Sequence, residues 1–148
     1  MEEIIRDILS IRRGIICHQA NCIGAMGAGL AKSIRDLWPH IYDDYCKAVK
    51  NNEFRLGDCR IAQAAPGIFV AHLAGQQGIG YGKKNTNYSA LREALKNLNR
   101  QINASYVLMR MPIYIPYGIG SGLGGGDWEF VRKILEEEVP NATICKLG

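Results

Sequence analysis

Residues 114–128 constrain the fold more than any other stretch, because six glycines fall within the nine residues from 118 to 126. The apolar residues 106–115 come just before them and predict a buried strand. Asp127 follows as a predicted helix N-cap, ahead of an amphipathic segment that continues to Glu138. A strand that opens through glycines into a helix N-terminus is typical of a phosphate or anion site, since a ligand can approach the backbone N–H groups. The alternative is a tight turn closed for packing alone, which needs only one or two glycines.

A second unit of the same kind lies earlier in the chain. Residues 14–20 (GIICHQA) predict a buried strand, residues 21–29 (NCIGAMGAG) a glycine-rich loop, and the segment from Leu30 a helix that Trp38 and Pro39 end. In an α/β domain, two such units place both helix N-termini at one crevice, at the carboxyl ends of adjacent strands. The expected ligand therefore has at least one phosphate and a sugar. The P-loop pattern GxxxxGK[ST] is absent, and GAMGAG departs from the dinucleotide pattern GxGxxG.

The remaining segments complete an α/β pattern in one domain, residues 1–148. A first strand or a helical turn is expected within residues 1–9, and a helix over residues 40–51. A strand pair is expected over 59–64 and 68–74, and a final strand over 142–145. The polar loop 75–87 is long enough to be functional; Thr86 or Asn87 is its predicted helix cap, and Lys83 and Lys84 are either solvated or able to close over an anion. His72 is predicted to be a satisfied interior histidine. The result is a layered α/β sandwich of about six strands and four helices.

Composition excludes several classes of protein. No apolar run is long enough to span a membrane and no leader is visible, so we expect no membrane partner and a cytoplasmic location, or the host cytoplasm for a phage protein. The five cysteines form no CxxC pair and are predicted to be free thiols; a zinc site at Cys17, His18 and Cys22 lacks a fourth ligand. We expect neither metal nor cofactor. The net charge of +4 is modest and scattered, which suits anionic small molecules better than nucleic acid.

The two glycine-rich loops also have a recognisable sequence pattern. NCIGAMGAGLAKSIRDLWP from position 21 and PYGIGSGLGGGDW from position 116 resemble the signature loops of the macro domain, an ADP-ribose-binding family. The MGAG loop resembles the branch that includes terminal ADP-ribose glycohydrolases, ADP-ribose-1''-phosphate phosphatases and phage proteins. The resemblance covers nearly the whole chain. It implies a three-layer α/β/α sandwich with a mixed central sheet.

The resemblance also implies a role for individual residues. Asp7 would accept a hydrogen bond from the adenine amine and Ile8 would line the same pocket, whereas periodicity alone makes Asp7 a solvated surface charge. Asn21 would bind the distal ribose. The remaining implied contacts are to the diphosphate and that ribose, through the backbone of Gly27, Ala28, Gly29, Gly118, Ile119, Gly120, Ser121, Gly122 and Leu123. Backbone donors of this kind need no lysine.

The resemblance identifies the catalytic groups less directly than the binding residues. The glycohydrolases that act through a lysine adduct carry that lysine where this chain has Gln76 and Gln77, and their catalytic aspartate falls opposite Gly124, which speaks against that mechanism here. The candidates are His18, whose ordinary pKa suits proton transfer, Asn21, which would orient the substrate, and Asp127, which either acts as a base or only caps its helix. A packed strand histidine is the alternative for His18. The substrate's own diphosphate could also hold the water.

The predicted function is therefore an ADP-ribose-binding macro domain that hydrolyses ADP-ribose derivatives at the distal ribose. Its substrate would be ADP-ribose-1''-phosphate or an ADP-ribosylated protein. The alternative is a non-catalytic reader of ADP-ribose or of ADP-ribosylated proteins, and an RNA-binding macro domain is a third, less favoured interpretation.

Overall fold

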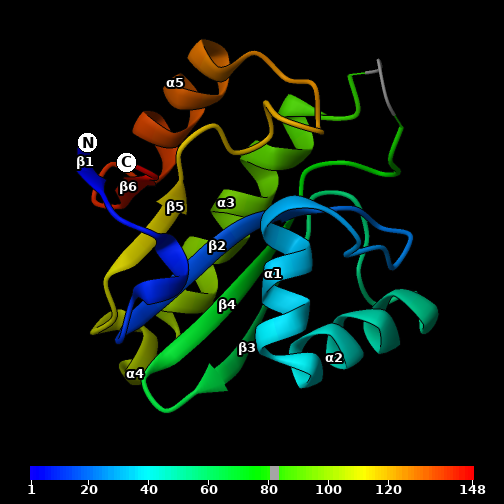
Figure 1. The fold of residues 1–148 in the computed structure, drawn as a ribbon, viewed down its shortest axis with the longest axis horizontal. Coiled ribbons are helices and arrows are strands. Elements are labelled where there is room, and N and C mark those ends of the chain that lie inside the picture. The colour runs from blue at the N-terminus through cyan, green and yellow to red at the C-terminus, as the bar shows by residue number, and fades with distance from the viewer. Residues whose placement is uncertain (81–83) are drawn as a thin grey trace.

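The computed structural model describes residues 1–80 and 84–148, and its centre is a six-stranded sheet (Figure 1). The strands run in the spatial order β1-β6-β5-β2-β4-β3. Every neighbouring pair is parallel except β3 and β4, the predicted strand pair, which is antiparallel and forms a hairpin. The sheet is thus mixed, as expected. Its strands are β1 (Glu2–Ile5), β2 (Gly14–Ala20), β3 (Cys59–Ala65), β4 (Ile68–Ala74), β5 (Ile113–Pro116) and β6 (Thr143–Lys146).

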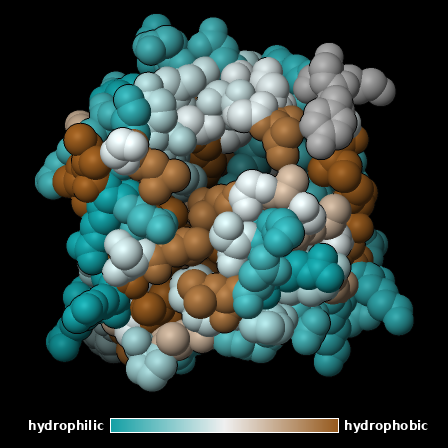
Figure 2. All heavy atoms as spheres, viewed as in Figure 1, coloured by the Kyte–Doolittle hydropathy of each residue, from teal (hydrophilic) through white to brown (hydrophobic). Residues whose placement is uncertain are grey.

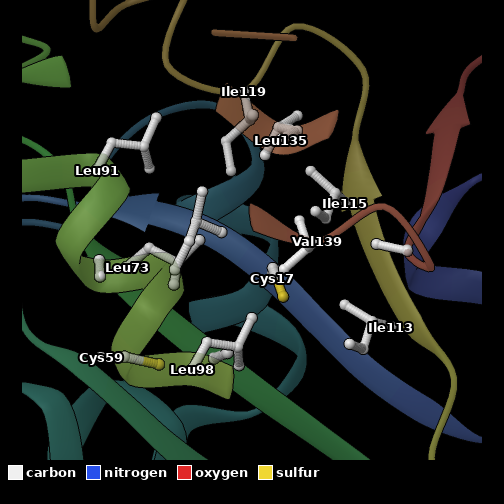
Figure 3. Close-up of a cluster of buried hydrophobic side chains, with 14 of the residues drawn as sticks. Cys17, Cys59, Leu73, Leu91, Leu98, Ile113, Ile115, Ile119, Leu135 and Val139 are labelled. Carbon is white, nitrogen blue, oxygen red and sulfur yellow. The ribbon is translucent and has the colours of Figure 1, made fainter. Parts of the chain in front are cut away.

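Helices cover both faces of this sheet. Two of them, α1 (Gly29–Leu37) and α2 (Pro39–Lys50), pack on the face that carries Ala20 and Val70. On the other face, α3 (Tyr88–Asn103) and α5 (Trp128–Glu138) pack against Cys17, Leu73 and Ile115 (Figure 3). The short elements are a 3-10 turn, η1 (Ile8–Ser10), and α4 (Tyr106–Met109). Alternate residues of β2 and β4 therefore face two separate cores, which makes the predicted three-layer sandwich.

The ends of the helices follow the signals in the sequence. Trp38 ends α1, and Pro39 begins α2 at a position where a missing N–H costs nothing. Asn87, one of the two predicted caps, accepts a hydrogen bond from Ala90 N at 3.0 Å. Asp127 likewise accepts from Glu129 N at 2.9 Å and starts α5 where predicted.

The prediction of one strand over residues 106–115 is wrong. Tyr106–Met109 form α4 instead, because the Ser105 hydroxyl caps that turn by accepting from Leu108 N at 3.2 Å. The apolar side chains of Tyr106, Val107 and Met109 are exposed rather than buried, so the run does not belong to the core. An apolar run alone does not separate a strand from a helical turn. Only Ile113–Pro116 pair as a strand.

The parallel strands bring three loops to one edge of the sheet. The Asn21 loop (residues 21–28) follows β2, the β4–α3 loop (residues 75–87) follows β4, and the glycine loop (residues 117–127) follows β5. Since β2 pairs in parallel with both β4 and β5, the carboxyl ends of all three lie together. Within the described residues no helix is both long and apolar enough to cross a membrane.

Candidate functional site

Two adjoining hollows lie at the carboxyl ends of the strands, and Figure 2 shows the hollowed face of the molecule. The Asn21 cavity has a volume of about 440 Å³, and the glycine-loop groove beside it about 360 Å³. Both are bordered by His18, Gln19, Ala28, Ala31, Gln76 and Leu123, so they form one continuous site. The predicted meeting of the two loops is confirmed, because Ala28 of the Asn21 loop and Gly118 of the glycine loop line the same groove. A hollow of about 480 Å³ beside β3 is larger but contains none of the predicted site residues.

Several glycines of these loops are required by the protein's own packing. An added Cβ at Gly124 would lie 2.5 Å from the Thr86 hydroxyl oxygen and 2.8 Å from the Gly120 carbonyl oxygen. At Gly126 it would lie 2.7 Å from the same carbonyl. Real Cβ atoms do not approach so closely. The alternative of glycines selected for packing therefore accounts for part of this pattern.

Packing within the protein does not explain three other glycines. A Cβ at Gly27, Gly29 or Gly122 would meet no atom of the described structure within 4 Å, and all three border the site. Gly29 has a φ of +59°, which favours glycine by itself, but Gly27 and Gly122 do not lie in the left-handed region. Open space beside these two glycines indicates room for a ligand that contacts the backbone directly.

A hydrogen-bonded cluster that sequence analysis missed holds the loops together. Gln19, at the end of β2, donates through Nε2 to Gln76 Oε1 and to the Thr86 hydroxyl, each at 2.8 Å. The Thr86 hydroxyl then donates to the Gly120 carbonyl at 2.6 Å. The backbone N–H groups of Asn85 and Thr86 also donate to the Gly124 carbonyl. The β4–α3 loop therefore braces the glycine loop, and no local pattern in the sequence signals this contact.

Asn21 lies in the cavity that bears its name and is 6% exposed. Its Oδ1 accepts from Ile23 N at 3.2 Å, from Ala25 N at 3.1 Å and from the Tyr45 hydroxyl at 2.7 Å. Its Nδ2 donates to the Ala25 carbonyl at 2.7 Å. Asn21 thus organises the loop that follows β2, and the side chain is held in one orientation.

His18 borders the site but is buried, with 3% of its surface exposed. Its Nε2 lies 2.6 Å from Nδ1 of His72, directly across the β2–β4 pair. His18 Nδ1 and His72 Nε2 have no hydrogen-bond partner in the described structure, so His72 is interior as predicted but only half satisfied. The prediction of a pKa near neutrality for His18 is wrong, because burial lowers that pKa to about 4. Burial also lowers the pKa of His72, so both rings are neutral at pH 7.

Other predicted residues lie outside the two hollows. The Asp127 carboxylate caps α5. The backbone N–H of Asp127 donates to the Tyr88 hydroxyl at 2.9 Å and is therefore not available to a ligand. Asp7 is exposed and accepts from Leu9 N, while Ile8 packs in the core beside β2. The Ser121 hydroxyl donates to the Gly118 carbonyl. The catalytic role of Asp127 and the adenine role of Asp7 and Ile8 stay predictions.

Charged side chains contribute little to the described lining of the site. Among the residues that border the two hollows, none of those described is Asp, Glu, Lys or Arg. Lys84 lies with its ammonium group 4.2 Å from the centre of the Tyr88 ring, and Lys83 lies outside the described residues. The five cysteines are free, as predicted, and no metal-binding group of His, Cys, Asp or Glu occurs in the described part of the chain. Among the described residues, anion binding would therefore depend on the backbone.

The sequence model of the family described as "Macro domain" matches residues 17–135. This range includes both loops of the site and most of the sheet. The chain belongs to the macro domain family. The predicted family and fold are confirmed.

Two curated relatives of this macro domain are similar in sequence. An uncharacterized 17.5 kDa protein of Enterobacteria phage T4 is 27% identical over 122 residues, which cover 82% of this chain and 77% of that protein. The DNA ADP-ribosyl glycohydrolase of Mycobacterium tuberculosis is 25% identical over 130 residues, or 87% of this chain. This macro domain corresponds to only 36% of the length of that glycohydrolase.

Solved structures agree on the fold. A protein from Bacteroides thetaiotaomicron superimposes with a TM-score of 0.86 at 27% identity, covering 99% of each chain. Thermosipho africanus DarTG, solved in complex with ADP-ribose, superimposes with a TM-score of 0.74 at 19% identity, covering 96% of this chain and 40% of that one. At that identity the second likeness concerns the fold alone.

Proposed function

We propose that this macro domain binds ADP-ribose at the carboxyl edge of its sheet and hydrolyses the bond between the distal ribose and its substituent. The observation that carries the proposal is the open N-terminus of α1, which faces the glycine loop across one groove. Ala28 is the N-cap of α1 and makes no side-chain cap hydrogen bond, whereas Asn87 and Asp127 cap α3 and α5. The first N–H groups of α1 are therefore available for an anion.

The diphosphate fits the groove between these elements. The partial positive charge of the helix N-terminus and the backbone donors of the glycine loop would offset its two negative charges without a lysine. Gly27 and Gly122 leave the space that close approach needs. Beyond the diphosphate, the adjoining Asn21 cavity of about 440 Å³ would take the distal ribose.

Hydrolysis would proceed with little help from charged side chains. Because burial makes His18 neutral and Asp127 lies outside the lining, the substrate's diphosphate is the best candidate to hold the attacking water. The relative named a DNA ADP-ribosyl glycohydrolase supports chemistry at the distal ribose and adds ADP-ribosylated DNA to the two predicted substrates. All three substrates share ADP-ribose and differ in the group that leaves.

A non-catalytic reader of ADP-ribose is the alternative. It is supported by the absence of Asp, Glu, Lys and Arg from the described lining of the site. A reader needs the same groove but no activated water.

Calorimetry with ADP-ribose tests the binding step first, with AMP as the control ligand that lacks a diphosphate. We expect ADP-ribose to bind and AMP to bind more weakly; no heat with ADP-ribose would refute the proposal. The protein is then incubated with ADP-ribose-1''-phosphate, a glutamate-ADP-ribosylated protein and ADP-ribosylated DNA. Release of phosphate or of ADP-ribose supports the enzyme, while tight binding with all three substrates intact supports the reader. In the active case, Asn21→Ala should weaken activity and binding together, and His18→Ala tests whether the buried ring contributes to the chemistry.

A further inference from the structure

Tyr45 is a fully buried aromatic residue on α2 whose hydroxyl reaches the functional site. Its ring stacks on His72 with the centroids 5.2 Å apart, and it meets Phe54 edge-on at 5.6 Å. The hydroxyl oxygen lies 2.7 Å from the main-chain carbonyl oxygen of Asn21 and 2.7 Å from Asn21 Oδ1. A buried tyrosine needs a partner for its hydroxyl, but here the partner is a side chain that lines the cavity.

The hydrogen bonds of Asn21 leave it a single free group. An asparagine side chain has one acceptor oxygen and two N–H donors. The backbone N–H groups of Ile23 and Ala25 occupy the two lone pairs of Oδ1, so it has none to offer the cavity. The single Tyr45 hydroxyl proton lies within reach of both Oδ1 and the Asn21 main-chain carbonyl. One N–H of Nδ2 donates to the Ala25 carbonyl, which leaves the other. The opposite amide orientation would place NH₂ against backbone donors, so Asn21 can offer the cavity a donor and not an acceptor.

Tyr45 differs from the other partners of this side chain. Ile23 and Ala25 belong to the same loop as Asn21 and move with it. Tyr45 belongs to α2, and its ring packs against His72 and Phe54. Among the described hydrogen bonds of the Asn21 side chain, the one with the Tyr45 hydroxyl alone ties it to a regular element of the fold.

We propose that Tyr45 is a positioning residue that presents the remaining N–H of Asn21 to a hydroxyl oxygen of the sugar beyond the diphosphate. This inference rests on the proposed binding of ADP-ribose. The groove between α1 and the glycine loop takes the diphosphate, so the adjoining cavity takes the sugar attached to it. A sugar hydroxyl accepts a hydrogen bond from an N–H, and a fixed donor loses less entropy on binding than a mobile one.

The test is Tyr45→Phe, which removes the hydroxyl and keeps the stacked ring. ADP carries the diphosphate but lacks the distal ribose, so it reports on the groove and not on Asn21. We expect the affinity for ADP-ribose to fall by about 3- to 10-fold, the range of one net hydrogen bond, with no change for ADP. Tyr42→Phe is the matched control, since Tyr42 lies on the same helix and its hydroxyl is 3.5 Å from the Gly24 carbonyl of the same loop. It should leave both affinities unchanged.

A double-mutant cycle shows whether Tyr45 acts through Asn21. If it does, Tyr45→Phe combined with Asn21→Ala binds ADP-ribose no more weakly than Asn21→Ala alone. Three outcomes would each overturn the inference: unchanged affinity for ADP-ribose in Tyr45→Phe, an equal loss of affinity for ADP, or additive losses in the double variant. In all three cases the proposed function still stands, provided that the wild-type protein binds ADP-ribose. Failure of the wild-type protein to bind ADP-ribose would instead overturn the proposed function, and the inference with it. Thermal unfolding of each variant confirms that the fold is retained.

Discussion

Gly122→Ala should abolish tight ADP-ribose binding while the fold stays as stable as in the wild type. A Cβ at Gly122 meets no heavy atom within 4 Å, and its φ is not in the left-handed region. The change in the free energy of unfolding should therefore stay within about 0.5 kcal/mol. A methyl group keeps a phosphate oxygen at van der Waals distance, where a backbone N–H would otherwise bond to it. Losing one charge-assisted hydrogen bond weakens binding by about 1.5–3 kcal/mol, or roughly 10- to 150-fold.

Gly124→Ala, two residues further on, should instead destabilise the fold. Its Cβ would lie 2.5 Å from the Thr86 hydroxyl, 2.8 Å from the Gly120 carbonyl and 3.0 Å from Gln19 Nε2. Overpacking of this kind costs about 2–3 kcal/mol and lowers the melting temperature by about 5–10 °C.

Thermal unfolding and calorimetry with ADP-ribose on the two variants provide the comparison. Wild-type affinity in Gly122→Ala would refute the assignment of this space to the ligand. A melting temperature equal to that of the wild type in Gly124→Ala would refute the packing argument.

Three further predictions use thermal unfolding and calorimetry, and one of them adds an assay of hydrolysis. Because burial lowers the pKa of His18 from 6.5 to about 4, the folded protein binds fewer protons than the unfolded chain between these values. The free energy of unfolding should be highest above pH 6.5 and fall by roughly 3 kcal/mol as the pH drops toward 4. In His18→Gln the free energy of unfolding should depend less steeply on pH; an identical pH dependence in the two proteins would contradict the burial argument. Asp127→Ala should cost about 1 kcal/mol through the lost cap on Glu129 N, whereas Asp127→Asn keeps the cap; loss of hydrolysis in both, at wild-type affinity, would instead make Asp127 catalytic. Thr86→Val should cost about 1–3 kcal/mol and weaken ADP-ribose binding, since it removes the bond to the Gly120 carbonyl that braces the glycine loop; unaltered affinity would show that the brace does not matter for the ligand.

Local signals predicted most of the fold correctly. Asn87 and Asp127 begin their helices where their side chains can accept from the next turn, and Pro39 separates α1 from α2. The hairpin of β3 and β4 follows from two apolar runs joined at Gly67. These features depend on residues within a few positions of one another. The segment 106–115 failed because its apolar residues fit a helical turn as well as a strand, and the Ser105 cap decided between them.

The site was predicted less completely than the fold. The two glycine loops were expected to meet, and they do. The brace formed by Gln19, Gln76 and Thr86 was missed, because its members are 57 and 67 positions apart along the chain. The neutral state of His18 was missed as well, since its pKa depends on burial beside His72 rather than on neighbouring residues.

By itself the sequence determined the order of the strands and helices outside residues 106–115, the capping of α3 and α5, and the two glycine-rich connections, because each depends on backbone preferences of adjacent residues. Tertiary structure alone decided which glycines face open space and which face Thr86, since both kinds look the same in the sequence. It also decided that the Tyr45 hydroxyl meets Asn21. These outcomes depend on how distant segments pack around one edge of the sheet, where parallel pairing brings the ends of β2, β4 and β5 together.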